Sequence, residues 1–85
     1  MSSMDFFDLI IKDSISLINE EMEKLRLKKI CRDDVLLFFD DDTFGISVSV
    51  NLRKSRKILL NKRMTKISRR IATEHRVGGY SIVVE

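Results

Sequence analysis

Apolar side chains change their spacing twice along this 85-residue chain, which limits the folds open to it. From about residue 3 to residue 29 they recur at steps of three and four, the period of one helix face. The residues with this spacing are Met4, Phe7, Ile11, Ile15, Ile18, Met22 and Leu25. A strand-like pattern follows, and the helical period returns at residues 52–77, where Leu60, Met64, Ile67 and Ile71 form a stripe. Residues 80–84 predict a final strand.

Two strands are expected between the helices. Residues 35–39 are continuously apolar, as in a buried strand. Apolar and polar residues then alternate over 46–52, so a strand is expected there whose polar face shows Ser47, Ser49 and Asn51. Asp and Gly residues at 40–45 are turn formers, and the two strands should pair as an antiparallel hairpin.

The predicted fold is an α+β two-layer sandwich (α/β) of order α-β-β-α-β, in one domain over residues 1–85. Both helices would cover one face of a three-stranded mixed sheet. Ser2 or Ser3 is expected to cap the first helix, and Gly78-Gly79 to end the second. A domain this small is only marginally stable by itself. A homodimer through the first helix would bury the excess apolar surface of that helix.

Charge is strongly segregated along the chain. Residues 1–42 hold eleven acids and six bases, whereas residues 43–85 hold two acids and ten bases. Like charges at positions 62, 66 and 70 would repel one another, and an anionic partner would relieve that repulsion. The predicted RNA- or polyanion-binding residues are Arg53, Arg56, Lys57, Lys62, Arg63, Lys66, Arg69, Arg70 and Arg76. Because this arc should be solvated, Glu at 62, 66 and 70 is expected to abolish binding without loss of stability.

Metal and cofactor chemistry are not expected. Asp40, Asp42 and Gly45 match part of a calcium loop, but Phe44 and Asn51 stand where ligands are required. There is no glycine-rich phosphate loop and no pair of Cys or His residues for zinc.

The single cysteine and histidine also argue against an enzyme. Cys31 cannot form an intrachain disulfide, which favours a reducing cytoplasm, and it is expected to be a small buried residue. His75 has no nucleophile beside it in a known motif. No apolar run is long enough to span a membrane, and no secretory signal is recognised at the N-terminus.

The basic segment Arg53-Lys54-Ser55-Arg56-Lys57, in a small proline-free chain rich in Ile, Lys and Asp, resembles the small early proteins of T-even-type phages. In size and charge the chain is similar to an RNA-binding factor of that group that inhibits a host endoribonuclease toxin. The resemblance implies counter-defence, with the toxin ribonuclease as partner and RNA contributing to the complex.

Three functions remain open from the sequence. The leading hypothesis is a non-enzymatic RNA-binding protein whose second helix contacts backbone phosphates. The first alternative is an inhibitor or adaptor whose basic helix binds an acidic enzyme surface without RNA. The second is a small toxin-type ribonuclease with Tyr80 or His75 as proton carrier.

Overall fold

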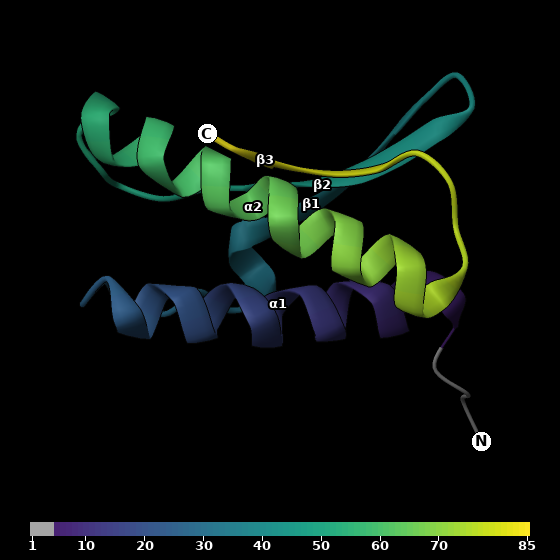
Figure 1. The fold of residues 1–85 in the computed structure, drawn as a ribbon, viewed down its shortest axis with the longest axis horizontal. Helices are drawn as coiled ribbons and strands as arrows, with labels where there is room; N and C mark the ends of the chain where they lie inside the picture. Colours follow the sequence, from purple (N-terminus) through teal and green to yellow (C-terminus); the bar gives the residue numbers. More distant parts are fainter. Residues whose placement is uncertain (1–4) are drawn as a thin grey trace.

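Two helices cover one face of a three-stranded sheet in the computed structural model, which describes residues 5–85 (Figure 1). The elements are α1 (Phe6–Lys24), a 3-10 turn η1 (Arg32–Asp34), β1 (Val35–Asp40), β2 (Thr43–Val48), α2 (Lys54–His75) and β3 (Tyr80–Val84). Strand β2 is central, antiparallel to β1 and parallel to β3. The predicted order and mixed sheet are confirmed.

Helix α1 is shorter than the periodicity suggested. Asp5 caps it, because its carboxylate accepts the backbone N–H of Asp8 at 2.8 Å. The predicted caps Ser2 and Ser3 lie outside the described residues. The helix ends at Lys24, since Arg26 takes a left-handed φ of 57° and the N–H of Leu27 returns to the Met22 carbonyl. The apolar residues after it therefore continue in a non-helical segment.

Helix α2 ends in the same way, also on an arginine. Arg76 has a φ of 55°, and the N–H of Val77 bonds to the Ala72 carbonyl. The prediction that Gly78-Gly79 ends this helix is thus wrong, because hydrogen bonds already close its last turn at Arg76. Gly79, with a φ of 72°, instead turns the chain into β3.

Strand β2 starts earlier than its apolar alternation suggested, because only Asp41 and Asp42 form the turn after β1. Gly45 therefore lies inside the strand. A Cβ atom there would collide with the Ser81 carbonyl oxygen and lie 2.7 Å from the Phe38 ring. Glycine is needed at this position for close packing in the middle of the sheet, not for a turn.

The core lies between the sheet and both helices. The predicted stripe of α2 is confirmed, since Leu60, Met64, Ile67 and Ile71 are all buried. They pack with residues of α1 and of the inner sheet face, which are Ile10, Ile11, Ile18, Met22, Ile46, Val48, Ile82 and Val84. One hydrogen bond crosses this core, between the hydroxyls of Ser14 and Tyr80 at 2.7 Å.

Among residues 5–85, no helix lies on the other sheet face (Figure 1). Ser47, predicted on this face, lies there between Leu36 of β1 and Val83 of β3. Within residues 5–85, neither long helix has the length and apolar content to cross a bilayer.

Candidate nucleic-acid interface

The antiparallel packing of the helices joins two basic segments that are distant in sequence. Arg63 of α2 donates to the Glu21 carboxylate of α1 at 3.0 Å, and His75 pairs with Asp13 at 2.8 Å. The last turn of α1 and the first turn of α2 therefore lie at the same end of the molecule, on the left of Figure 1. We call this the basic end, formed by Lys24, Arg26, Lys28, Lys29, Arg53, Lys54, Arg56 and Lys57.

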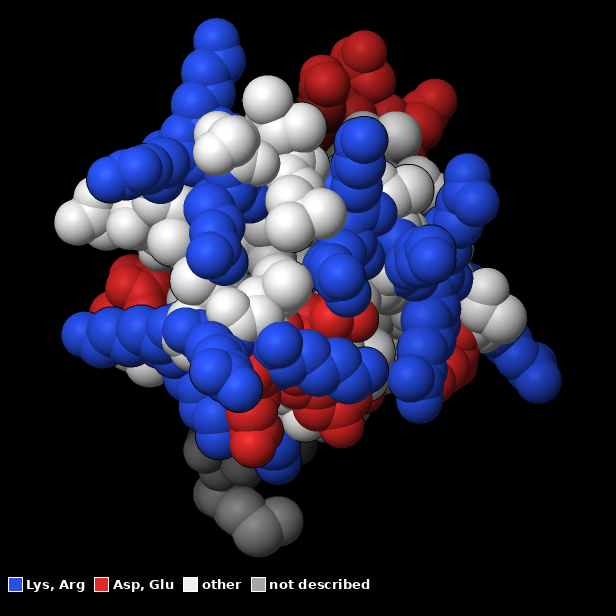
Figure 2. All heavy atoms as spheres, turned by 60° about the vertical axis from the view of Figure 1, so that its left-hand side comes forward, with Lys and Arg blue, Asp and Glu red and all other residues white. Residues whose placement is uncertain are grey.

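Most of these side chains are available to a partner. All are exposed except Lys57, which is half-buried. Among residues 5–85, the one ion pair that involves the basic end joins Lys29 to Glu23 at 4.0 Å. Both side chains are well exposed, so this pair is weak. Figure 2 turns this end toward the viewer and shows Lys and Arg side chains gathered across it.

The start of α2 adds to the positive potential. Arg53 precedes the first turn, but its side chain makes no capping hydrogen bond, and the first turn contains no acid. Backbone N–H groups at a helix start carry partial positive charge, which favours anions. Here they add to the charges of Lys54 and Arg56.

The predicted site does not form one continuous surface. Arg63 is half-buried in its pair with Glu21, and Arg70 pairs with Glu74 at 3.0 Å. Lys66 and Arg70 line a groove together with acidic residues of α1. Glu20 and Glu21 in this groove belong to the other helix, so spacing within α2 could not reveal them, whereas Glu74 lies four residues after Arg70 on α2 itself.

Three further predicted residues lie away from the basic end. A helix of 22 residues is about 33 Å long, so Arg76 is at the opposite end of α2 from Arg53. Lys62 and Arg69 are exposed between these limits.

From the predicted set, the structure gathers Arg53, Arg56 and Lys57 at the basic end. It adds Lys54 and the four Lys and Arg residues at 24–29, which were not among the predicted binding residues. The sequence held one indication of this arrangement, because both helices were expected to pack on the same face of the sheet. When two such helices run in opposite directions, the end of the first lies near the start of the second.

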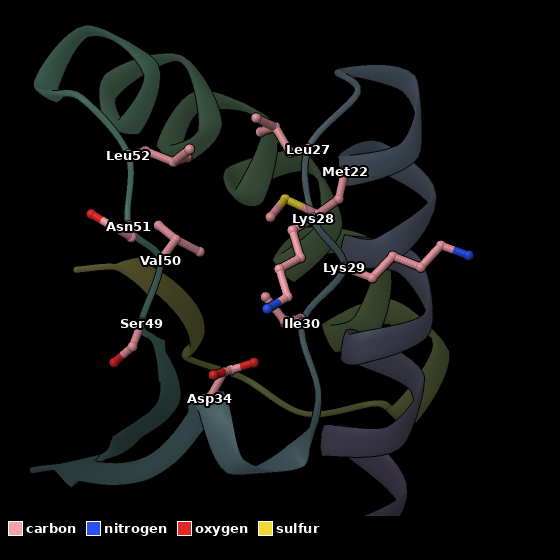
Figure 3. A pocket seen from close by; sticks show the side chains of 10 residues that line it. All are labelled: Met22, Leu27, Lys28, Lys29, Ile30, Asp34, Ser49, Val50, Asn51 and Leu52. Carbon is pink, nitrogen blue, oxygen red and sulfur yellow. The ribbon is translucent and has the colours of Figure 1, made fainter.

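A pocket of about 660 Å³ opens between the two basic segments (Figure 3). Its apolar lining comes from Met22 and Ile30, which are buried, and from Leu27, Val50 and Leu52, which are half-buried. The polar lining residues are Lys28, Lys29, Asp34, Ser49 and Asn51. Its volume falls in the range of about 300–1,000 Å³ that is usual for small-molecule sites.

Hydrogen bonds hold both walls of this pocket. On one side the Asn19 side chain donates to the Ile30 carbonyl at 2.9 Å and accepts the Ile30 N–H at 2.8 Å. On the other, the N–H of Ser49 bonds to the Asp34 carbonyl at 2.9 Å, and that of Val50 to the Glu85 carbonyl at 3.3 Å. The pocket is therefore built into the fold although irregular segments line it.

Asp34 supplies an ionised carboxylate to the pocket. Its pKa is lowered because its Oδ2 accepts the Cys31 backbone N–H at 2.9 Å and the Cys31 thiol at 3.5 Å, and Lys28 adds a favourable charge. Cys31 itself is exposed, so the expectation that it is buried is wrong. The segment before η1 runs on the surface, and no helix covers the thiol.

Two other candidate sites have little support. No group of three metal-ligating side chains is assembled within residues 5–85, the Asp40–Asp42 turn included. Tyr80, one of the two proton carriers considered for the ribonuclease alternative, is only 7% exposed and is bonded to Ser14, while the other, His75, pairs with Asp13. Desolvation raises the pKa of Tyr80 to about 12, far from the value that suits a proton carrier at neutral pH.

No protein-family model, curated protein or solved structure matches this chain. The resemblance to phage early proteins therefore stays a prediction, and the function has to be argued from the surface.

Proposed function

We propose that this protein binds single-stranded RNA without cleaving it, through contacts between the basic end and backbone phosphates. The observation that carries the proposal is that residues 24–29 and 53–57 lie at the same end of the molecule (Figure 1), which concentrates eight Lys and Arg side chains there. Lys and Arg are the residues that most often neutralise phosphates, and such contacts need no particular base sequence.

Within residues 5–85, most of the charge at the basic end is not held in ion pairs, although Lys28 lies near Asp34 and Lys24 lines a groove with Glu20 and Glu21. Elsewhere, Arg63 and Arg70 pair with carboxylates, whereas the one ion pair that the described residues form at the basic end is the weak one between Lys29 and Glu23. Uncompensated like charges cost stability, and a polyanion would offset that cost. The proposed setting is the cytoplasm, and the proposed role is that of the phage factor the chain resembles, with a host ribonuclease toxin as partner.

The test is the salt dependence of binding to a short fluorescent single-stranded RNA, measured by anisotropy. Each phosphate contact contributes about 0.7 to the slope of log affinity against log salt. Replacing Lys54→Gln and Arg56→Gln together should reduce the slope by about 1.4 and weaken binding. The matched control is Lys12→Gln with Arg69→Gln, which removes the same charge from exposed positions outside the basic end.

Equal effects of the two double variants would show that binding depends on net charge alone and would contradict the proposed site. Absence of salt-dependent binding would contradict RNA binding itself. If the protein instead binds no RNA but captures an acidic protein, and this complex persists after ribonuclease treatment, the result would favour an inhibitor that acts through protein contact.

A further inference from the structure

We propose that the pocket between the two basic segments receives one unstacked nucleobase of the bound strand, selected for an exocyclic amino group. This inference rests on the proposed function and adds a base-binding site to its phosphate contacts. Aromatic residues are few in this chain, which argues against a wide platform for base stacking. A pocket whose lining is partly apolar can hold a base without an aromatic platform.

The position of the pocket relates it to the strand. Residues 27–30 form one wall of the pocket and directly follow Lys24 and Arg26. Residues 49–52 form the other wall and directly precede the Lys and Arg residues at 53–57. A strand whose phosphates contact both segments can therefore pass the mouth of the pocket. Bases of single-stranded RNA are free to turn out of the stack into such a site.

The lining suits the faces of a base. In Figure 3 the Met22 sulfur and the Val50 side chain point into the pocket, whereas Lys29, Ser49 and Asn51 point away from its centre. Thioether sulfur makes favourable contacts with aromatic rings, and apolar side chains exclude water from the faces of the base. Met22 is 2% exposed and Ile30 is 6% exposed, so this apolar floor is fixed by the core beneath it.

Two charged groups supply polarity where a nucleotide needs it. Lys28 lines the pocket and is also one of the residues of the basic end, so its ammonium can reach a phosphate at the mouth. Its charge also lies near Asp34. Asp34 is an acceptor only when ionised, and the two hydrogen bonds from Cys31 both end on Oδ2.

The other oxygen of Asp34 is left to accept a hydrogen bond from a base. Cytosine offers an amino group where uracil offers a carbonyl oxygen, which an ionised carboxylate repels. The pocket is therefore expected to prefer amino-bearing bases over uracil.

The experiment compares three strands of equal length with the wild-type protein: oligocytidine, oligouridine and a strand with the same phosphates but abasic sugars. All three should show the same salt slope, because their phosphates are the same. Oligocytidine should bind about tenfold more tightly than the abasic strand, which corresponds to about 1.4 kcal/mol, and oligouridine should be intermediate or weak.

A filled pocket provides the matched variant. Val50→Trp should reduce the affinity for oligocytidine to that for the abasic strand and leave the salt slope unchanged. Val83→Trp, on the open sheet face, is the control and should leave the preference intact. Circular dichroism checks that both variants fold, and the wild-type comparison needs neither of them.

The outcomes separate this inference from the proposed function. Equal affinity for oligocytidine and the abasic strand, with the salt slope retained, would overturn the base pocket and leave phosphate binding standing. Equal affinity for oligocytidine and oligouridine would overturn the selection by Asp34. Absence of salt-dependent binding to any strand would overturn both proposals.

Discussion

At the scale of single residues, the hydroxyl pair of Ser14 and Tyr80 is a polar contact inside the core. It joins α1 to the first residue of β3 across 2.7 Å, and neither residue is more than 7% exposed. A buried hydroxyl without a partner is costly, so each of these residues depends on the other. Neither partner could be recognised from the sequence, where Ser14 is one of several serines and Tyr80 opens a strand.

Tyr80→Phe should lower the free energy of unfolding by about 1 kcal/mol near neutral pH, because it leaves the Ser14 hydroxyl unpaired in the core. The double variant with Ser14→Ala should recover part of this loss. Urea denaturation measures both changes. A double variant that loses the sum of the two single effects would show that the pair contributes nothing.

The same tyrosine predicts a loss of stability in alkali. Its pKa is raised to about 12 in the fold from 10.0, chiefly by desolvation, so the folded chain keeps its phenolic proton when the unfolded chain has lost it. Stability is therefore full below about pH 10 and falls as the pH rises toward 12, by up to roughly 3 kcal/mol. Tyr80→Phe lacks this contribution and should lose less stability between neutral pH and about pH 11. Parallel losses in the two proteins would contradict the assignment.

At the scale of elements, the contact between α1 and α2 decides which basic residues are free. Arg63 is held by Glu21, and Lys66 lies in a groove with acids of α1. The expectation that Glu at 62, 66 and 70 leaves stability unchanged therefore does not hold for all three positions. At 66 and 70 a carboxylate would face the acids of α1, and the pair of Arg70 with Glu74 would be lost.

Lys66→Glu with Arg70→Glu should lower the free energy of unfolding by about 1 kcal/mol, since surface pairs of this kind are each worth about 0.2–1 kcal/mol. In a domain of this size the melting temperature should fall by roughly 4–8 °C. Lys62→Glu is the control. It places Glu four residues before Lys66, a favourable helical spacing, and should keep or slightly raise the melting temperature. A control that melts as low as the double variant would contradict the role of the α1 acids.

At the scale of the whole molecule, most of the apolar surface that suggested a dimer is used inside one chain. Ile10 is fully buried, and Leu17 packs against the core. On α1, Phe6 and Leu9 remain 45% and 43% exposed. These two side chains are the part of the helix left for a second copy.

A homodimer through α1 remains a prediction that sedimentation can test. We expect a mass of two 9.9 kDa chains, and Leu9→Lys should convert it to one chain without unfolding it. Val83→Lys, on the open sheet face, should leave the dimer intact. A mass of one chain for the unaltered protein at all concentrations would contradict dimerisation, and dissociation by Val83→Lys alone would move the interface to the sheet.

The sequence by itself determined the elements of this protein and their order, because the spacing of apolar residues depends directly on the helical or strand period. It also determined the buried stripe of α2, in which Leu60, Met64, Ile67 and Ile71 repeat at that period. Helix ends were less predictable, because an arginine takes the left-handed conformation at each of them. At the end of α2 that conformation was expected of Gly78-Gly79, and at the end of α1 no residue was expected to adopt it.

Only the tertiary structure decided which charges act together. The Lys and Arg residues at 24–29 and 53–57 lie at one end of the molecule (Figure 1) because α1 and α2 pack antiparallel, and the same packing pairs Arg63 with Glu21. The pocket between them also depends on long-range bonds, such as those from Asn19 to Ile30 and from Val50 to Glu85. Periodicity describes the neighbours of a residue along one element, whereas electrostatic and cavity properties depend on neighbours that only the packing of different elements brings together.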